Sequence, residues 1–182
     1  MVSRNCSTSS SSIGELLQHS SCGHRTLGDG PCPAAVASLN LPTAIVVSVG
    51  DGDTLRTDYQ GQNITVRFVC IDTSETTQTP WRSAATERLR QLIPSGSTIQ
   101  FKEADTDCYG RMVAKVYAGG QNVNLQMVNE GHAAVYTQFL SSCPNTDDAL
   151  LCAKTQAQQQ QRLNFWNQPN PVMLWDYRRS NR

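Results

Sequence analysis

Four short segments of this 182-residue chain carry side chains that could do metal or phosphate chemistry. They are Asp51–Thr54 (DGDT), Arg67, Asp72–Glu75 (DTSE) and Asp107–Arg111 (DCYGR). Carboxylates and backbone carbonyls are hard oxygen ligands, and arginine donates planar pairs of hydrogen bonds to phosphate oxygens. Taken singly, each segment is a weak signal, because aspartates commonly cap turns. Their combination in this order is what indicates a shared site.

Two of the aspartates are placed to share a cation. Asp53 begins one predicted strand and Asp72 ends another, so a hairpin-like connection can bring their carboxylates together. With the backbone oxygen of Thr73 they offer a ligand set that suits Ca²⁺, with water completing about six to eight positions. Magnesium could also bind but needs tighter octahedral geometry. The histidines and cysteines lack zinc-finger spacing, which argues against zinc.

Two arginines can form a phosphate clamp beside such a cation. Arg67 precedes Asp72 by five residues, which separates their backbones by about 17 Å along a straight strand. A long side chain on a curved barrel strand can still reach the same site. Arg111 follows Gly110 at the start of another predicted strand.

The order of these motifs resembles the staphylococcal nuclease (thermonuclease) family. DGDT is followed by R-x4-DT-x-E, then by DxYGR, a short helix and a terminal helix ending in LNFW. The likeness runs from about Ala44 to Asn167. It implies an α+β fold with a five-stranded Greek-key barrel of the oligonucleotide-binding (OB) type and three helices. It also implies a calcium-dependent endonuclease that cleaves both DNA and RNA.

The resemblance also assigns roles to individual residues. Asp53, Asp72 and the Thr73 carbonyl are expected to hold Ca²⁺. The residues expected at the scissile phosphate are Arg67, Glu75 and Arg111. Water would attack in line and the bond to the 5′ oxygen would break, leaving a 3′-phosphate and a 5′-hydroxyl. Glu75 would orient or deprotonate that water, although a carboxylate near a cation has a low pKa and is a modest base.

Some positions depart from the family pattern or leave two interpretations open. Ser74 stands where the family often has proline, and Cys108 where staphylococcal nuclease has lysine. Tyr109, Tyr136 and Phe139 are candidates for substrate contact, because stacking on an aromatic ring tolerates every base. Packing in the core is an equally good interpretation of these three rings.

The elements that must position these residues are readable from pattern and turn signals. Strands are predicted at 44–50, 53–58, 64–71, 97–102 and 111–117, and helices at 80–94, 122–131 and 147–163. Five short strands with a helix after the third and two further helices form an α+β pattern. A small closed barrel lets such strands avoid bare edges.

Composition bounds the domain organisation and the partners. We expect a flexible leader over residues 1–40, one domain over 41–167 and a tail over 168–182 that packs back on the body. The charge balance is even, with 15 basic and 15 acidic residues, so any grip on nucleic acid must come from placed arginines and a metal. We expect a monomer that acts on single-stranded or frayed DNA and RNA, with no membrane partner.

Cysteine usage bears on the compartment. Seven cysteines favour an oxidising environment, hence an exported protein, although no compact apolar export signal is visible. Cys143–Cys152 and Cys22–Cys32 are possible bridges, and Cys70 reads as a buried inert thiol. The competing function is a catalytically silent barrel that only binds nucleic acid or protein, since a fold permits either.

Overall fold

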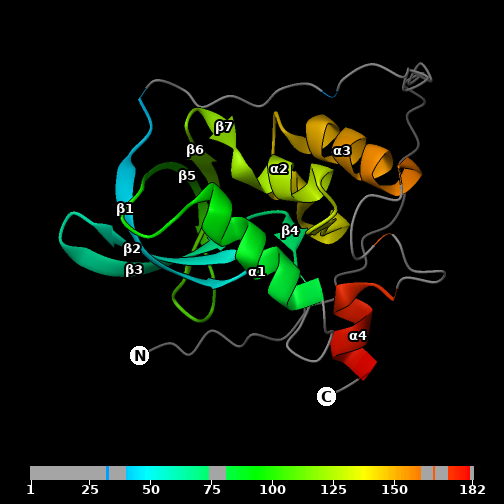
Figure 1. Ribbon diagram of the computed structural model, residues 1–182, viewed down its shortest axis with the longest axis horizontal. Helices are drawn as coiled ribbons and strands as arrows, with labels where there is room; N and C mark the ends of the chain where they lie inside the picture. The colour runs from blue at the N-terminus through cyan, green and yellow to red at the C-terminus, as the bar shows by residue number, and fades with distance from the viewer. Residues whose placement is uncertain (1–31, 33–39, 74–80, 161–165, 167–171, 181–182) are drawn as a thin grey trace, which may run out of the picture. The chain divides into compact units, whose positions relative to one another are not determined.

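The computed structural model describes residues 32, 40–73, 81–160, 166 and 172–180, all within the unit Cys32–Arg182 (Figure 1). Its strands are β1 (Thr43–Asp51), β2 (Thr54–Tyr59), β3 (Gln62–Phe68), β4 (Ile71–Asp72), β5 (Thr98–Thr106), β6 (Met112–Ala118), β7 (Gln121–Asn122) and β8 (Ala134–Val135). Its helices are α1 (Trp81–Leu92), α2 (Val123–Asn129), the 3₁₀ helix η1 (Thr137–Ser142), α3 (Asp147–Gln159) and α4 (Leu174–Ser180). The expected α+β class is confirmed.

Five strands close into a small mixed barrel. The main sheet runs β3-β2-β1-β5-β6-β7, and β3 also pairs with β6. That closing pair is parallel, with Arg67 opposite Val113, whereas the other pairs of the sheet are antiparallel. Closure leaves no bare edge among the five strands, as the sequence predicts.

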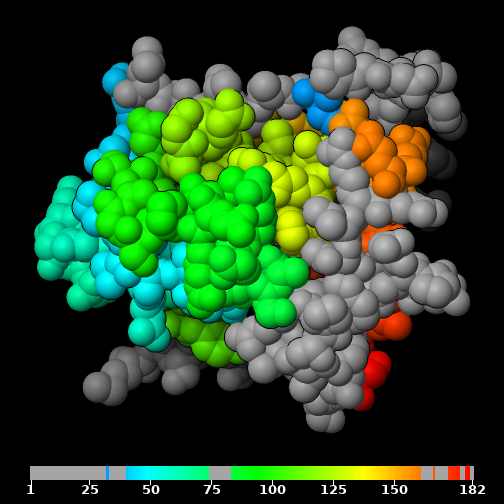
Figure 2. Space-filling view, viewed as in Figure 1, coloured from blue at the N-terminus to red at the C-terminus, as the bar shows by residue number. Residues whose placement is uncertain are grey.

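Alternation along the strands fills the barrel interior. On β3 the side chains of Val66 and Phe68 are buried, and on β5 those of Ile99 and Phe101 are buried as well. Successive strand residues point to opposite faces, so these pairs share the inner face. Helix α1 packs against β1 and spreads across the face of the unit seen in Figure 2. Its buried Leu89 joins the same core.

The third strand ends earlier than its apolar sequence predicts. The predicted strand 64–71 is wrong at its end, because β3 stops at Phe68 and a turn separates it from β4. Cys70 adopts a φ of 63°, a left-handed conformation that a continuous strand does not allow. The chain therefore changes direction just before Asp72, and Ile71 and Asp72 pair with β8 instead.

Disulfides link distant segments rather than neighbours. Cys70 is bonded to Cys143, and Cys32 is bonded to Cys152. The predictions of a Cys143–Cys152 bridge, a Cys22–Cys32 bridge and a free Cys70 thiol are therefore wrong. Cys108 is also disulfide-bonded. Sequence spacing cannot decide such pairs, because the fold brings cysteines together across 73 and 120 residues.

The tail contributes a helix, α4, that lies beside the end of the barrel domain. Its Leu174 is buried in a small apolar cluster with Ala134, Ala157 and Trp166. The expected helices appear as α1, α2 and α3, and the predicted leader falls outside the described residues except for positions 32 and 40. None of the helices in the described ranges is both long and apolar enough to cross a membrane.

Candidate active site

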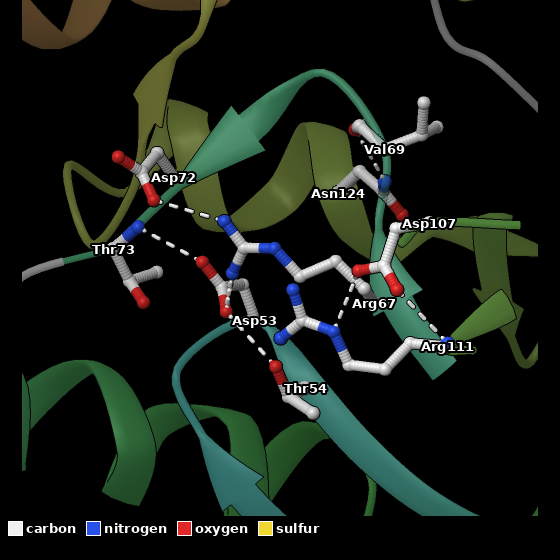
Figure 3. Close-up of polar contacts among 9 residues, drawn as sticks. All are labelled: Asp53, Thr54, Arg67, Val69, Asp72, Thr73, Asp107, Arg111 and Asn124. Carbon is white, nitrogen blue, oxygen red and sulfur yellow. Dashed lines mark hydrogen bonds and ion pairs between the residues drawn. The ribbon is translucent and has the colours of Figure 1, made fainter. Parts of the chain in front are cut away.

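Asp53 and Asp72 lie close together, one on each side of the Arg67 guanidinium (Figure 3). Asp53 occupies the tight connection between β1 and β2, and Asp72 ends β4. Both carboxylates are buried, with exposed fractions of 1% and 0%. The Nη2 atom of Arg67 lies 2.9 Å from Asp72 Oδ1, and Nη1 contacts Asp53 Oδ1. The two aspartates and the arginine singled out from the sequence thus share one site.

One backbone and one side-chain hydrogen bond position the Asp53 carboxylate. The Thr73 N–H donates to Asp53 Oδ2 at 3.0 Å, and the Thr54 hydroxyl donates to Oδ1 at 3.2 Å. Gly52 permits this close packing, because an added Cβ would lie 2.7 Å from Ala85 and 3.0 Å from Thr73. The Asp-Gly-Asp turn therefore packs tightly between Ala85 of α1 and the Thr73 side chain.

The electrostatics of this cluster favour a cation. Burial raises the pKa of Asp53 from 3.8 to about 6; Arg67 opposes this shift, and the carboxylates of Asp51 and Asp72 add to it. Asp51 Oδ1 is buried and has no hydrogen-bond partner within the described part of the chain. Such a carboxylate oxygen is costly unless a positive group approaches it. Asp51 was not assigned a role from the sequence, although it opens the DGDT motif.

Arg67 and Arg111 face a common pocket of about 260 Å³. Its walls include both arginines, Asp107, Tyr136 and Phe139. The burial of Arg67 would lower its pKa, but the attraction of Asp53 and Asp72 raises it. Two guanidiniums at one pocket, beside a carboxylate cluster, are donors of the kind that bind a phosphate group.

Asp107 holds Arg111 in place. Its carboxylate accepts hydrogen bonds from Arg111 Nε at 2.7 Å and from the Arg111 and Tyr109 N–H groups at 2.9 Å each. Burial alone would raise the pKa of Asp107, but the hydrogen bonds from Arg111 and Tyr109 lower it. Gly110, with a φ of 76°, lets the chain reverse direction between Asp107 and Arg111. Because Asp107 engages Nε, the terminal amino groups of Arg111 can donate to an anion.

Asn124 secures the turn that leads to Asp72, a role that no motif in the sequence signals. Its side chain is buried in α2, donates to Val69 O at 3.0 Å and accepts from the Val116 N–H at 3.0 Å. A buried amide with satisfied hydrogen bonds specifies one arrangement of its neighbours. The position of the Val69–Cys70 turn, and hence of Asp72, therefore depends on Asn124.

The remaining predicted site residues are placed unevenly. Tyr136 and Phe139 line the pocket, whereas Tyr109 is outside it and 79% exposed. The Arg111 guanidinium carbon lies 5.3 Å from the centre of the Tyr109 ring, within range of a cation–π contact. Glu75 and Ser74 lie outside the described residues.

Comparison with known proteins decides the family. The model of the "Staphylococcal nuclease homologue" family matches residues 65–168. The chain belongs to the staphylococcal nuclease family. It is 37% identical over 134 residues to an "Uncharacterized endonuclease" of Escherichia coli O157:H7, covering 73% of this chain and 82% of the relative. As a member of this family, the chain is a phosphodiester-hydrolysing endonuclease.

Two further relatives carry nuclease names. A "Micrococcal nuclease" of Shigella flexneri is 34% identical over 146 residues, which is 75% of this chain and 80% of the relative. "Endonuclease YncB" of Bacillus subtilis (strain 168) is 31% identical over 129 residues, which is 67% of this chain and 60% of the relative. The resemblance seen in the motifs is thus confirmed.

The residues of this staphylococcal nuclease homologue fit a hard divalent cation. No group of three His, Cys, Asp or Glu side chains in the described ranges could hold a metal ion by itself. The arrangement implied by the family needs only two carboxylates and a backbone carbonyl. The unpartnered Asp51 oxygen is one that a cation could approach, and a bound cation would offset the burial that raises the pKa of Asp53.

Proposed function

We propose that this endonuclease is calcium-dependent and hydrolyses both DNA and RNA to 3′-phosphate and 5′-hydroxyl ends. The observation that carries the proposal is the position of Arg67, which contacts Asp53 and Asp72 and lines the same pocket as Arg111. These contacts support a proposal in which a metal site and a phosphate clamp are adjacent. A protein that only binds nucleic acid has no physical need for that combination.

The cation would be held by Asp53, Asp72 and the Thr73 carbonyl, with Asp51 close by. All-oxygen ligands suit Ca²⁺, which accepts irregular coordination more readily than Mg²⁺ does. When bound, Ca²⁺ supplies positive charge where the phosphate oxygens become more negative.

The side chains divide the reaction between them. Arg67 and Arg111 bind the scissile phosphate and stabilise the charge that develops on its oxygens. Glu75 orients the attacking water and accepts its proton. As the bond from water to phosphorus forms, the bond to the 5′ oxygen breaks. That oxygen takes a proton from solvent water and leaves as a 5′-hydroxyl, while the phosphate stays on the 3′ oxygen.

The substrate is a strand whose bases are accessible. Tyr136 and Phe139 at the pocket, with Tyr109 near Arg111, offer ring faces on which any base can stack. This suits a sugar-nonspecific enzyme acting as a monomer on single-stranded or frayed nucleic acid. The even charge balance predicts a weaker electrostatic grip than a basic relative would have.

The test is cleavage of matched single-stranded DNA and RNA oligonucleotides in calcium, in magnesium and in chelator. We expect cleavage of both in calcium, strong loss with chelator, and products that a 3′-phosphatase converts to 3′-hydroxyl ends. Glu75→Gln serves as the inactive control. Oligonucleotides that are bound but stay intact in calcium would favour the binding module instead.

We further propose that the protein works in an oxidising compartment. Each of the five cysteines in the described residues is disulfide-bonded: Cys32, Cys70, Cys108, Cys143 and Cys152. Disulfides persist outside the reducing cytoplasm. Thiol titration of protein isolated from its native host tests this, and several free thiols in active protein would contradict it.

A further inference from the structure

The tail helix α4 brings an aromatic ring onto the candidate substrate-binding residues. The rings of Trp175 and Tyr136 lie parallel, with centroids 5.0 Å apart and an interplanar angle of 2°. Phe139 meets the same Tyr136 ring edge-on, at 4.8 Å and 78°. Tyr136 is therefore held between a residue of the tail and a residue of η1.

The contact between Trp175 and Tyr136 is anchored at β8, the strand that pairs with β4. Leu174, the neighbour of Trp175, is buried with Ala134 of β8. Ala134 pairs with Asp72 of β4, and the Tyr136 N–H donates to Cys70 O at 2.9 Å. Helix α4 thus packs behind the segment that carries Asp72 and leads into Tyr136.

The three rings differ in their access to the pocket. Tyr136 and Phe139 line it, whereas Trp175 does not. The indole therefore stacks on Tyr136 without itself lining the pocket. Phe139 is 51% exposed and presents the more accessible ring to a ligand. Trp175 thus contacts a residue of the pocket wall and is not itself part of that wall.

We propose that α4 belongs to the substrate-binding site and that Trp175 is a positioning residue. It holds Tyr136, and through it Phe139, for stacking against a nucleobase beside the scissile phosphate. The inference rests on the proposed function, because it takes the ligand to be a nucleic-acid strand. It assigns the tail a role in substrate affinity and none in the chemical step.

Steady-state kinetics on a single-stranded DNA oligonucleotide in calcium test the proposal. Trp175→Ala is expected to raise KM roughly threefold to tenfold, the range of one aromatic pair, with kcat nearly unchanged. Trp175→Phe keeps a stacking ring and is expected to stay near the parent. Val172→Ala, at an exposed position just before α4, is the matched control. An unchanged or lowered KM, or a parallel fall in kcat, would overturn the proposal.

A double-mutant cycle separates positioning from simple loss of packing. Because Trp175 acts through Tyr136, adding Trp175→Ala to Tyr136→Ala should raise KM little further. Additive effects would overturn the proposed route. If Trp175→Ala unfolds, Trp175→Leu keeps apolar burial without stacking and is expected to show the same rise in KM.

A binding measurement distinguishes failure of this inference from failure of the proposed function. The probe is a fluorescein-labelled oligothymidylate in chelator, followed by anisotropy with the full chain. A parent that binds but does not cleave refutes the nuclease proposal and leaves the Trp175 effect on Kd measurable. A parent that cleaves normally, with equal Kd and KM in Trp175→Ala, refutes the inference alone.

Discussion

The Nη2 atom of Arg67 lies 2.9 Å from Asp72 Oδ1, although a straight strand would hold the two backbones about 17 Å apart. The left-handed turn at Cys70 redirects the chain between them. Arg67 contributes its charge and both terminal nitrogens to the carboxylate cluster, and its side chain also lines the pocket. These two roles are separable by mutation.

Arg67→Lys keeps the charge but removes the planar pair of donors, so turnover should fall by about a hundredfold or more. Thermal unfolding should change little. Arg56→Lys is the control, because Arg56 is exposed on β2. Single-turnover cleavage in saturating calcium is the measurement, and near-parental turnover in Arg67→Lys would contradict the proposed role.

Gly52→Ala is expected to damage both stability and the site. The added Cβ would approach Ala85 to 2.7 Å and Thr73 to 3.0 Å, so the turn that carries Asp53 must shift. Overpacking of this kind costs about 1–3 kcal/mol. Gly50→Ala is the matched control, because its Cβ would meet its nearest neighbour at an ordinary 3.4 Å. Denaturant unfolding and calcium titration of activity should distinguish the two variants.

Asp107→Asn should loosen Arg111 in a pH-dependent way. Hydrogen bonds from Arg111 and Tyr109 outweigh burial and lower the pKa of Asp107 below its ordinary 3.8. The stabilisation is therefore fully present above pH 3.8 and is lost as pH falls through the lower folded pKa. The difference in unfolding free energy between parent and variant should be constant above about pH 5 and shrink towards pH 3. A difference that grows on acidification would contradict this assignment.

Removal of the Cys70–Cys143 disulfide should impair the site as well as the fold. The bond closes a separation of 73 residues, worth about 4 kcal/mol in the chain-entropy account. It also joins the turn before Asp72 to the end of η1. The double variant Cys70→Ser/Cys143→Ser should therefore lose activity even at temperatures where it stays folded.

The second disulfide provides the comparison. Cys32→Ser/Cys152→Ser removes a bond of sequence separation 120, so the loss of stability should be similar. Cys152 lies in α3 and Cys32 before β1, and neither lines the pocket. Activity of the folded fraction should persist, and equal loss of activity in both double variants would count against a positioning role for Cys70–Cys143.

Much of the site could be predicted because its signals are local. Turn residues, strand alternation and the helix that follows Pro80 are decided within a few positions, and so are the residue types that bind cations and phosphate. Asp53, Arg67, Asp72 and Arg111 were singled out on these grounds, and the structure brings them together. The motif order sufficed to indicate the family.

What the sequence could not determine depends on contacts between residues far apart in the chain. The parallel closure of β3 on β6, the bridges from Cys70 to Cys143 and from Cys32 to Cys152, and the stacking of Trp175 on Tyr136 have no local signature. Each is selected by the packing of the whole domain, because only the closed barrel brings those groups within reach. The sequence by itself therefore determined which chemistry the chain carries, and the tertiary structure decided which side chains hold that chemistry in place.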